Sequence, residues 1–195
     1  LKQHVGEDAP WILGLRNAAI PRSLRTWTDA FEALNSPAPR DVLVIGKGPT
    51  FDRAAGWLQA HPEAISIGLN HVVERMPVTV AHLIDLDVLN QVEESAWWDN
   101  CEMIVMPWQP HIGFRPTVAS LQTLEHPLLR RLVQAGKVVW YNLSTAVRRG
   151  FTIRPPGPVI NCRSFSGEAV MQLLIAAGRS TVFTAGVDGG KAYSG

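Results

Sequence analysis

A glycine-rich loop that follows a short apolar run is the first candidate for chemistry. Residues 42–45 (VLVI) lead directly into Gly46-Lys47-Gly48-Pro49-Thr50, and a β-branched run of this length is typical of a strand buried in a parallel sheet. Glycines after such a strand let backbone N–H groups approach a phosphate, and the following helix N-terminus favours negative charge. The spacing matches neither the dinucleotide-binding G-x-G-x-x-G pattern nor a P-loop, so a turn that binds nothing remains the alternative.

A second turn with anion-binding chemistry lies near the other end of the chain. Ser164, Ser166 and Gly167 precede an apolar helical pattern, so hydroxyl and backbone N–H groups gather at a helix N-terminus. The next predicted strand ends at Gly186, and Asp188 follows it as the strongest single candidate for acid or base chemistry. The alternative for Asp188 is a turn aspartate that accepts backbone N–H groups.

Polar residues also follow two other predicted strands, at the edge where open α/β sheets bind ligands. His71, next to Asn70, could act as a general base near neutral pH, or could be structural. Asp85 and Asp87 share one side of an extended segment. They could hold a cation, or one could raise the pKa of the other; the alternative is a helix N-cap at Asp87 beside a solvated acid.

Apolar runs alternate with helical patterns and predict a Rossmann-like, doubly wound α/β fold with a mostly parallel sheet. The predicted strands are residues 42–45, 64–69, 78–84, 102–106, 137–141 and 181–185. The predicted helices are residues 23–34, 51–59, 87–98 and 127–135, and the segment between Gly167 and Gly178. We expect residues 1–40 to form a helical extension that packs on a nucleotide-binding domain of residues 41–195, and this domain to continue beyond Gly195.

Two other histidines differ in their predicted surroundings. His82 lies within an apolar strand, which predicts a core histidine with satisfied hydrogen bonds. His111 lies in a predicted loop of residues 108–116, where it could face an acceptor.

Composition excludes several classes of protein. A net charge of +1 over 195 residues argues against a nucleic-acid-binding face. No apolar run is long enough to span a bilayer, and no signal-peptide pattern opens the chain. Two distant cysteines match no metal or redox motif. We therefore expect a soluble cytoplasmic protein, with association at the inner membrane surface left open.

The order and spacing of these motifs resemble the bacterial sialyltransferases that use CMP-sialic acid, and their relatives of unassigned activity in surface-polysaccharide synthesis. Those enzymes carry a GNGPS loop after the first strand, an Asn after the second, a Ser-Gly turn before a late helix, and G-[IV]-D after the next strand. The resemblance covers residues 41–193. Two features depart from the family: Lys47 replaces its Asn, and its catalytic His has no counterpart before Gly195.

The resemblance implies a glycosyltransferase that uses a CMP-activated, sialic-acid-like donor in bacterial surface-glycan synthesis, by displacement at the anomeric carbon. The implied nucleotide and donor site comprises Gly46, Lys47, Gly48, Pro49, Thr50, Asn70, Asp85, Ser164, Ser166, Gly167 and Gly186. The candidate catalytic residues are His71, Asp188 and Tyr193, of which Tyr193 would donate to the leaving phosphate. No cofactor is required, and the partners are a nucleotide sugar and a glycan or lipid-linked glycan acceptor; the chain is compatible with a homo-oligomer.

Two other hypotheses stay open. The motifs also resemble the archaeal-type 6-hydroxymethylpterin diphosphokinases and related flagellin-glycosylation proteins, which would place Mg²⁺ on Asp85 and Asp87. A non-catalytic nucleotide-binding module is the remaining possibility.

Overall fold

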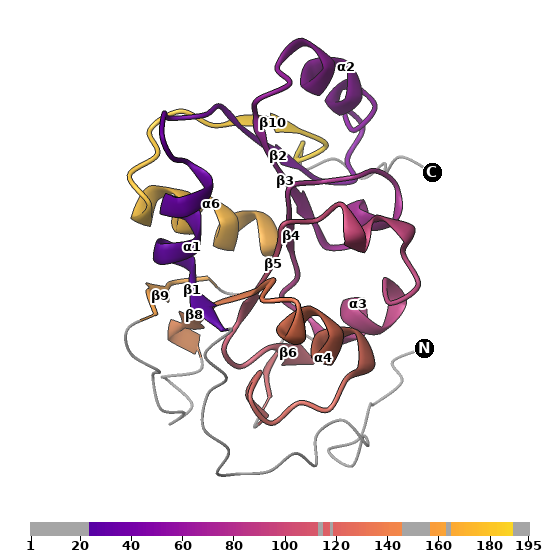
Figure 1. Ribbon diagram of the computed structural model, residues 1–195, viewed down its shortest axis with the longest axis vertical. Helices are drawn as coiled ribbons and strands as arrows, with labels where there is room; N and C mark the ends of the chain where they lie inside the picture. The colour runs from indigo at the N-terminus through magenta and orange to yellow at the C-terminus, as the bar shows by residue number, and fades with distance from the viewer. Residues whose placement is uncertain (1–23, 113–114, 118, 146–156, 163–164, 189–195) are drawn as a thin grey trace.

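The computed structural model describes residues 24–112, 115–117, 119–145, 157–162 and 165–188 (Figure 1). They form an eight-stranded sheet in which every pair of neighbouring strands is parallel, with helices on both faces. This confirms the predicted Rossmann-like, doubly wound α/β class.

The order of strands across the sheet is β1-β8-β5-β4-β3-β2-β10, and β9 pairs separately with β8. The strands of this sheet are β1 Arg25–Thr26, β2 Val42–Ile45, β3 Ile65–Leu69, β4 Val80–His82, β5 Met103–Pro107, β8 Val138–Leu143, β9 Val159–Ile160 and β10 Phe183–Ala185. All six predicted strands are present, and β2 and β5 show why they could be found: each is buried and apolar at every position and so leaves a continuous apolar run in the sequence. Two-residue β1 and β9 are too short to leave such a pattern.

Helices cover both faces of the sheet. They are α1 Trp27–Leu34, α2 Arg53–Ala60, α3 Leu86–Gln91, α4 Pro127–Gln134 and α6 Ser166–Ala176, with 3₁₀ turns η2 Asn70–Glu74 and η3 Ala96–Asp99. One apolar cluster joins the sheet to α1 and α6, and the indole of Trp27 crosses it to donate to the Leu173 carbonyl at 2.8 Å. The other cluster joins the opposite face to α2, α3 and α4.

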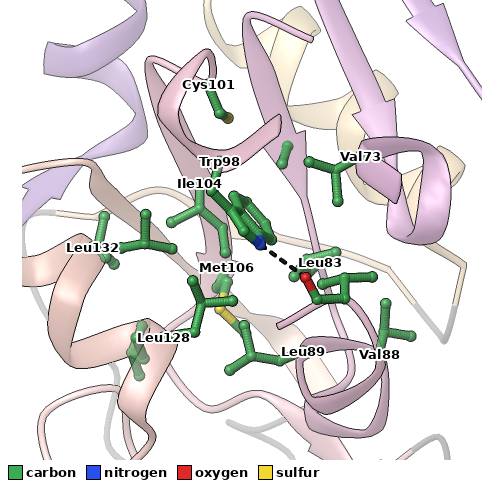
Figure 2. Packing of buried hydrophobic residues seen from close by; sticks show 14 of the residues in the cluster. Val73, Leu83, Val88, Leu89, Trp98, Cys101, Ile104, Met106, Leu128 and Leu132 are labelled. Atoms are coloured by element: carbon green, nitrogen blue, oxygen red, sulfur yellow. Dashed lines mark hydrogen bonds between the residues drawn. The ribbon is translucent and has the colours of Figure 1, made fainter. Parts of the chain in front are cut away.

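Trp98 lies in the middle of the second cluster, among Leu89, Ile104 and Leu128 (Figure 2). Its indole N–H donates to the Val92 carbonyl at 2.8 Å. The single helix predicted over 87–98 was wrong: α3 ends at Gln91 and η3 begins at Ala96. Between them the Val92 carbonyl accepts from the Ser95 N–H, in a tighter turn than an α-helix makes, as well as from the Trp98 indole.

The predicted helix 23–34 begins later than expected. Thr26 is the N-cap of α1, with an extended backbone and an Oγ1 that accepts from the Asp29 N–H. An extended cap allows the preceding residues to pair with β8 as β1, where Arg25 lies opposite Val139.

The predicted loop 108–116 contains a short antiparallel pair, β6 His111–Ile112 and β7 Arg115–Pro116. His111 is fully buried and its N–H donates to the Ile84 carbonyl, so its expected exposure was wrong. His82 is buried in the core as predicted, and burial lowers its pKa to about 3. The expectation of satisfied hydrogen bonds was wrong for one ring nitrogen: Nε2 lies 2.9 Å from the Tyr141 hydroxyl, but the buried Nδ1 has no hydrogen-bond partner among the described residues.

Candidate ligand-binding site

The order of strands reverses at β2, which defines where a ligand would bind. From β2 the chain adds β3, β4, β5 and β8 on one side, and β10 then pairs with the other side of β2, with Ala185 opposite Ile45 (Figure 1). In open α/β sheets, ligands bind beyond the carboxyl ends of the strands at such a reversal.

A cleft of about 550 Å³ lies at this reversal, a volume typical of small-molecule sites. It is lined by Gly46, Lys47, Gly48, Leu69, Asn70, Phe165, Ser166, Gly167, Glu168, Met171, Gly186 and Val187. The loops after β2, β3 and β10 and the first turn of α6 thus converge, as the predicted site required.

A second hollow of about 540 Å³ lies near the amino ends of β2 and β3 and is lined by residues 36–41 and 61–64. The side chain of Arg40 donates there to the Glu63 and Leu34 carbonyls. It includes none of the predicted site residues and lies opposite the strand ends that bind ligands in this fold class.

The two glycine loops pack backbone against backbone. The Gly46 N–H donates to the Ala185 carbonyl at 2.8 Å, and the Gly48 N–H donates to the Gly186 carbonyl at 2.7 Å. A Cβ on Gly46 would lie 2.3 Å from the Gly186 carbonyl oxygen, and Gly186 has a φ of +66°. The loop contact therefore requires these glycines. The prediction that their N–H groups face a phosphate was wrong, because both groups donate to the opposite loop.

Thr50 and Asp188 close the same contact. The Thr50 hydroxyl accepts from the Gly186 N–H at 2.8 Å and donates to Oδ1 of Asp188 at 2.5 Å, while the Thr50 N–H donates to Oδ2 at 2.7 Å. The hydrogen bond from the Thr50 hydroxyl, and then the one from the Thr50 N–H, lowers the pKa of the exposed Asp188 carboxyl. A carboxylate with a lowered pKa is a weak base, so the geometry favours the turn-aspartate alternative for Asp188.

The start of α6 and Asn70 are the two parts of the cleft whose geometry is typical of ligand-binding sites. Phe165, the N-cap of α6, has no side-chain oxygen with which to cap the first-turn N–H groups, and these lie at the positive end of the helix dipole. The Ser166 hydroxyl donates to Oδ1 of Asn70 at 2.8 Å. Asn70 has a φ of +52°, a left-handed conformation that costs free energy in a non-glycine residue and is concentrated at functional sites.

Other predicted site residues lie elsewhere. The imidazole of His71 is hydrogen-bonded to the Gln91 side-chain oxygen on α3, and His71 does not line the cleft. Pro49 and Thr50 belong to the first loop but are not in the lining. Ser164 and Tyr193 lie outside the described residues.

Asp85 follows β4, two strands away from β2, and does not line the cleft. Burial, and then the charge of Asp87, raises the pKa of Asp85 to about 6, and its Oδ1 is buried without a hydrogen bond. Within the described part of the chain, no three His, Cys, Asp or Glu side chains are grouped as a metal site would require. The Mg²⁺ hypothesis gains no support from this arrangement.

Five lining residues were missed by the sequence analysis: Leu69, Phe165, Glu168, Met171 and Val187. Only Phe165 carried a usable signal, because a large aromatic residue interrupts an otherwise small and polar turn before a helix.

Comparison of the chain with protein families, curated proteins and solved structures found no match. None of the helices in the described ranges is both long enough and apolar enough to cross a membrane.

Gly46→Ala should lower the free energy of unfolding by about 3 kcal/mol, because the new methyl group overlaps a backbone carbonyl that cannot move alone. Gly56→Ala is the matched control: a Cβ on Gly56, inside α2, meets nothing within 4 Å, so this change should raise stability by about 0.5–1 kcal/mol. Urea unfolding measures both. Equal tolerance of the two alanines would contradict the tight loop contact.

Asp85→Asn should raise the free energy of unfolding by about 1–2 kcal/mol at pH 7, after allowance for the partial exposure of the carboxylate. The folded-state pKa lies above the ordinary 3.8, so the cost of the charge is fully present above pH 6 and disappears as pH falls toward 4. The extra free energy of unfolding in Asp85→Asn should therefore vanish as the pH falls from 6 toward 4. Asp52→Asn, at an exposed carboxylate that also precedes a helix, is the control. Destabilisation by Asp85→Asn at pH 7 would show a stabilising partner for the carboxylate.

Proposed function

We propose that the chain is the nucleotide-binding domain of a glycosyltransferase and that its cleft binds a CMP-activated acidic sugar. The observation that carries this proposal is the cleft at the strand reversal, where Asn70 and the first turn of α6 face the loop that bears Lys47. The family resemblance of the motifs supplies the identity of the nucleotide and sugar.

The polar groups of the cleft suit a phosphate better than a neutral ligand. Backbone N–H groups at the start of an eleven-residue helix favour an anion, and the ammonium group of Lys47 adds a positive charge. Glu168 lies in the same first turn, and its carboxylate disfavours a negative group beside it. We therefore place the phosphate at the start of the turn, where Ser166 bonds to Asn70, and the carboxylate of the acidic sugar away from Glu168.

In the proposed reaction, the acceptor hydroxyl loses its proton to a base and its oxygen bonds to the anomeric carbon, while the phosphate leaves with the electrons of the broken bond. The helix N–H groups and Lys47 would stabilise the charge on the departing phosphate. His71 lies outside the cleft lining, and the pKa of Asp188 is lowered. The described residues are thus assigned to donor binding, and the base is left unassigned.

Calorimetric titration of the full chain with CMP, and with ATP plus Mg²⁺, each with and without EDTA, tests the proposal. We expect CMP to bind with micromolar affinity and EDTA to have no effect. Binding of ATP only with Mg²⁺ would instead support phosphoryl transfer, and no binding of either would contradict a nucleotide site.

Asn70→Gly sharpens this test, because glycine accepts the φ of +52° without strain and removes only the amide. If the amide orders Ser166 and faces the phosphate, CMP should bind about tenfold more weakly while stability is retained. Unchanged CMP affinity would exclude Asn70 from the site.

A further inference from the structure

We propose that Phe165 is the surface on which the base of the nucleotide stacks, an inference that rests on the proposed function. Phe165 is 68% exposed although it directly precedes a helix that is buried on one face. Single exposed apolar side chains are common on protein surfaces. Phe165 differs because it lies on the rim of the cleft that we assign to the nucleotide.

The backbone of Phe165 is held while its side chain projects outward. Its carbonyl accepts from the Ala169 N–H at 3.1 Å, which fixes it to the first turn of α6, and from the Cys162 thiol at 3.3 Å. Phe165 belongs to neither apolar cluster of the core. An aromatic ring on a fixed backbone loses little conformational entropy when it binds a ligand, because only two side-chain torsions remain to be ordered.

The lining of the cleft combines polar groups and apolar side chains, as a nucleotide combines a phosphate and a planar base. Ser166 and Gly167 offer backbone N–H groups for the phosphate, while Phe165, Met171 and Val187 are the apolar residues of the lining that lie closest to them in the sequence or in space. A nucleoside monophosphate carries its planar base and its phosphate on different carbons of one ribose. With the phosphate at the start of α6, a base that turns toward these apolar residues meets the ring of Phe165, the residue next to Ser166.

Stacking of a base on an aromatic side chain accepts any base, because every base has a π-face. Phe165 would therefore increase the affinity for any nucleotide base, and polar contacts would have to select cytosine. The two halves of the ligand are thus bound separately: the ring acts on the base, and Ser166, Gly167 and Lys47 act on the phosphate.

Calorimetric titration of the full chain with CMP and with ribose 5-phosphate tests this separation. Phe165→Ala should weaken CMP binding about tenfold or more and leave the affinity for ribose 5-phosphate unchanged, whereas Phe165→Trp should retain CMP binding. Ile175→Ala is the matched control, because Ile175 is equally exposed on α6, at 69%, but does not line the cleft; it should change neither affinity.

Three outcomes would overturn the inference. If Phe165→Ala binds CMP as the wild type does, the ring does not contact the base. If it weakens CMP and ribose 5-phosphate equally, Phe165 acts through the start of α6 and not by stacking. If the wild type binds ribose 5-phosphate but gains nothing from the base of CMP, the stacking surface is absent while the phosphate site stands. Failure of the wild type to bind either ligand would reject the proposed function together with this inference.

Discussion

The close approach of two backbone segments, Gly46–Gly48 and Gly186, is the constraint on which the cleft depends. Each segment follows a strand, and the strands β2 and β10 are neighbours only because the chain returns across the sheet after β8. Hydrogen bonds of 2.7 and 2.8 Å between the segments leave no room for a Cβ on either side. Any side chain there would push β10 away from β2 and open the floor of the cleft.

This contact changes how the first loop can serve a ligand. In a phosphate-binding glycine loop, successive N–H groups face the anion; here those of Gly46, Gly48 and Thr50 are bonded to residues 185–188, and Pro49 has no N–H. The loop therefore contributes the Lys47 side chain, and not its N–H groups, to the lining of the cleft. The N–H groups suited to an anion are those at the start of α6. The Asp188 carboxylate accepts two hydrogen bonds from Thr50 in the same loop contact and does not line the cleft, where a base would be needed.

The sequence predicted the fold well for a physical reason: strands covered on both faces are largely apolar, and β2 and β5 are apolar at every position. It also predicted that the loops after β2, β3 and β10 and the start of α6 would meet, since the carboxyl ends of parallel strands share one edge. What it could not give was the partner of each group. The Thr50–Gly186 bond joins residues 136 positions apart, and nothing local to a G-K-G-P-T motif indicates whether its N–H groups face a ligand or another loop. The same holds for His111: the neighbouring Pro107 and Pro110 predicted a loop, while the β6–β7 pair buries the side chain.

The carboxyl edge of the sheet is divided between two chemical environments. At β2, β3 and β10 the edge is open, and its polar groups lie around the cleft. At β4 and β8 the edge is closed, and the side chains of His82 and Tyr141 are hydrogen-bonded to each other out of contact with solvent. Burial lowers the pKa of His82 and raises the pKa of Tyr141. Both shifts keep the pair neutral, so it can lie inside an apolar cluster without an unpaired charge. The raised pKa of Asp85, at the same end, follows from the same burial. Perturbed pKa values are a common sign of a functional site, but the shifts that burial causes at His82, Asp85 and Tyr141 lie in the closed part of the edge. The open part is marked instead by the left-handed backbone of Asn70 and the start of α6, whose N-cap has no side-chain oxygen, and these features are the stronger reason to place the ligand there.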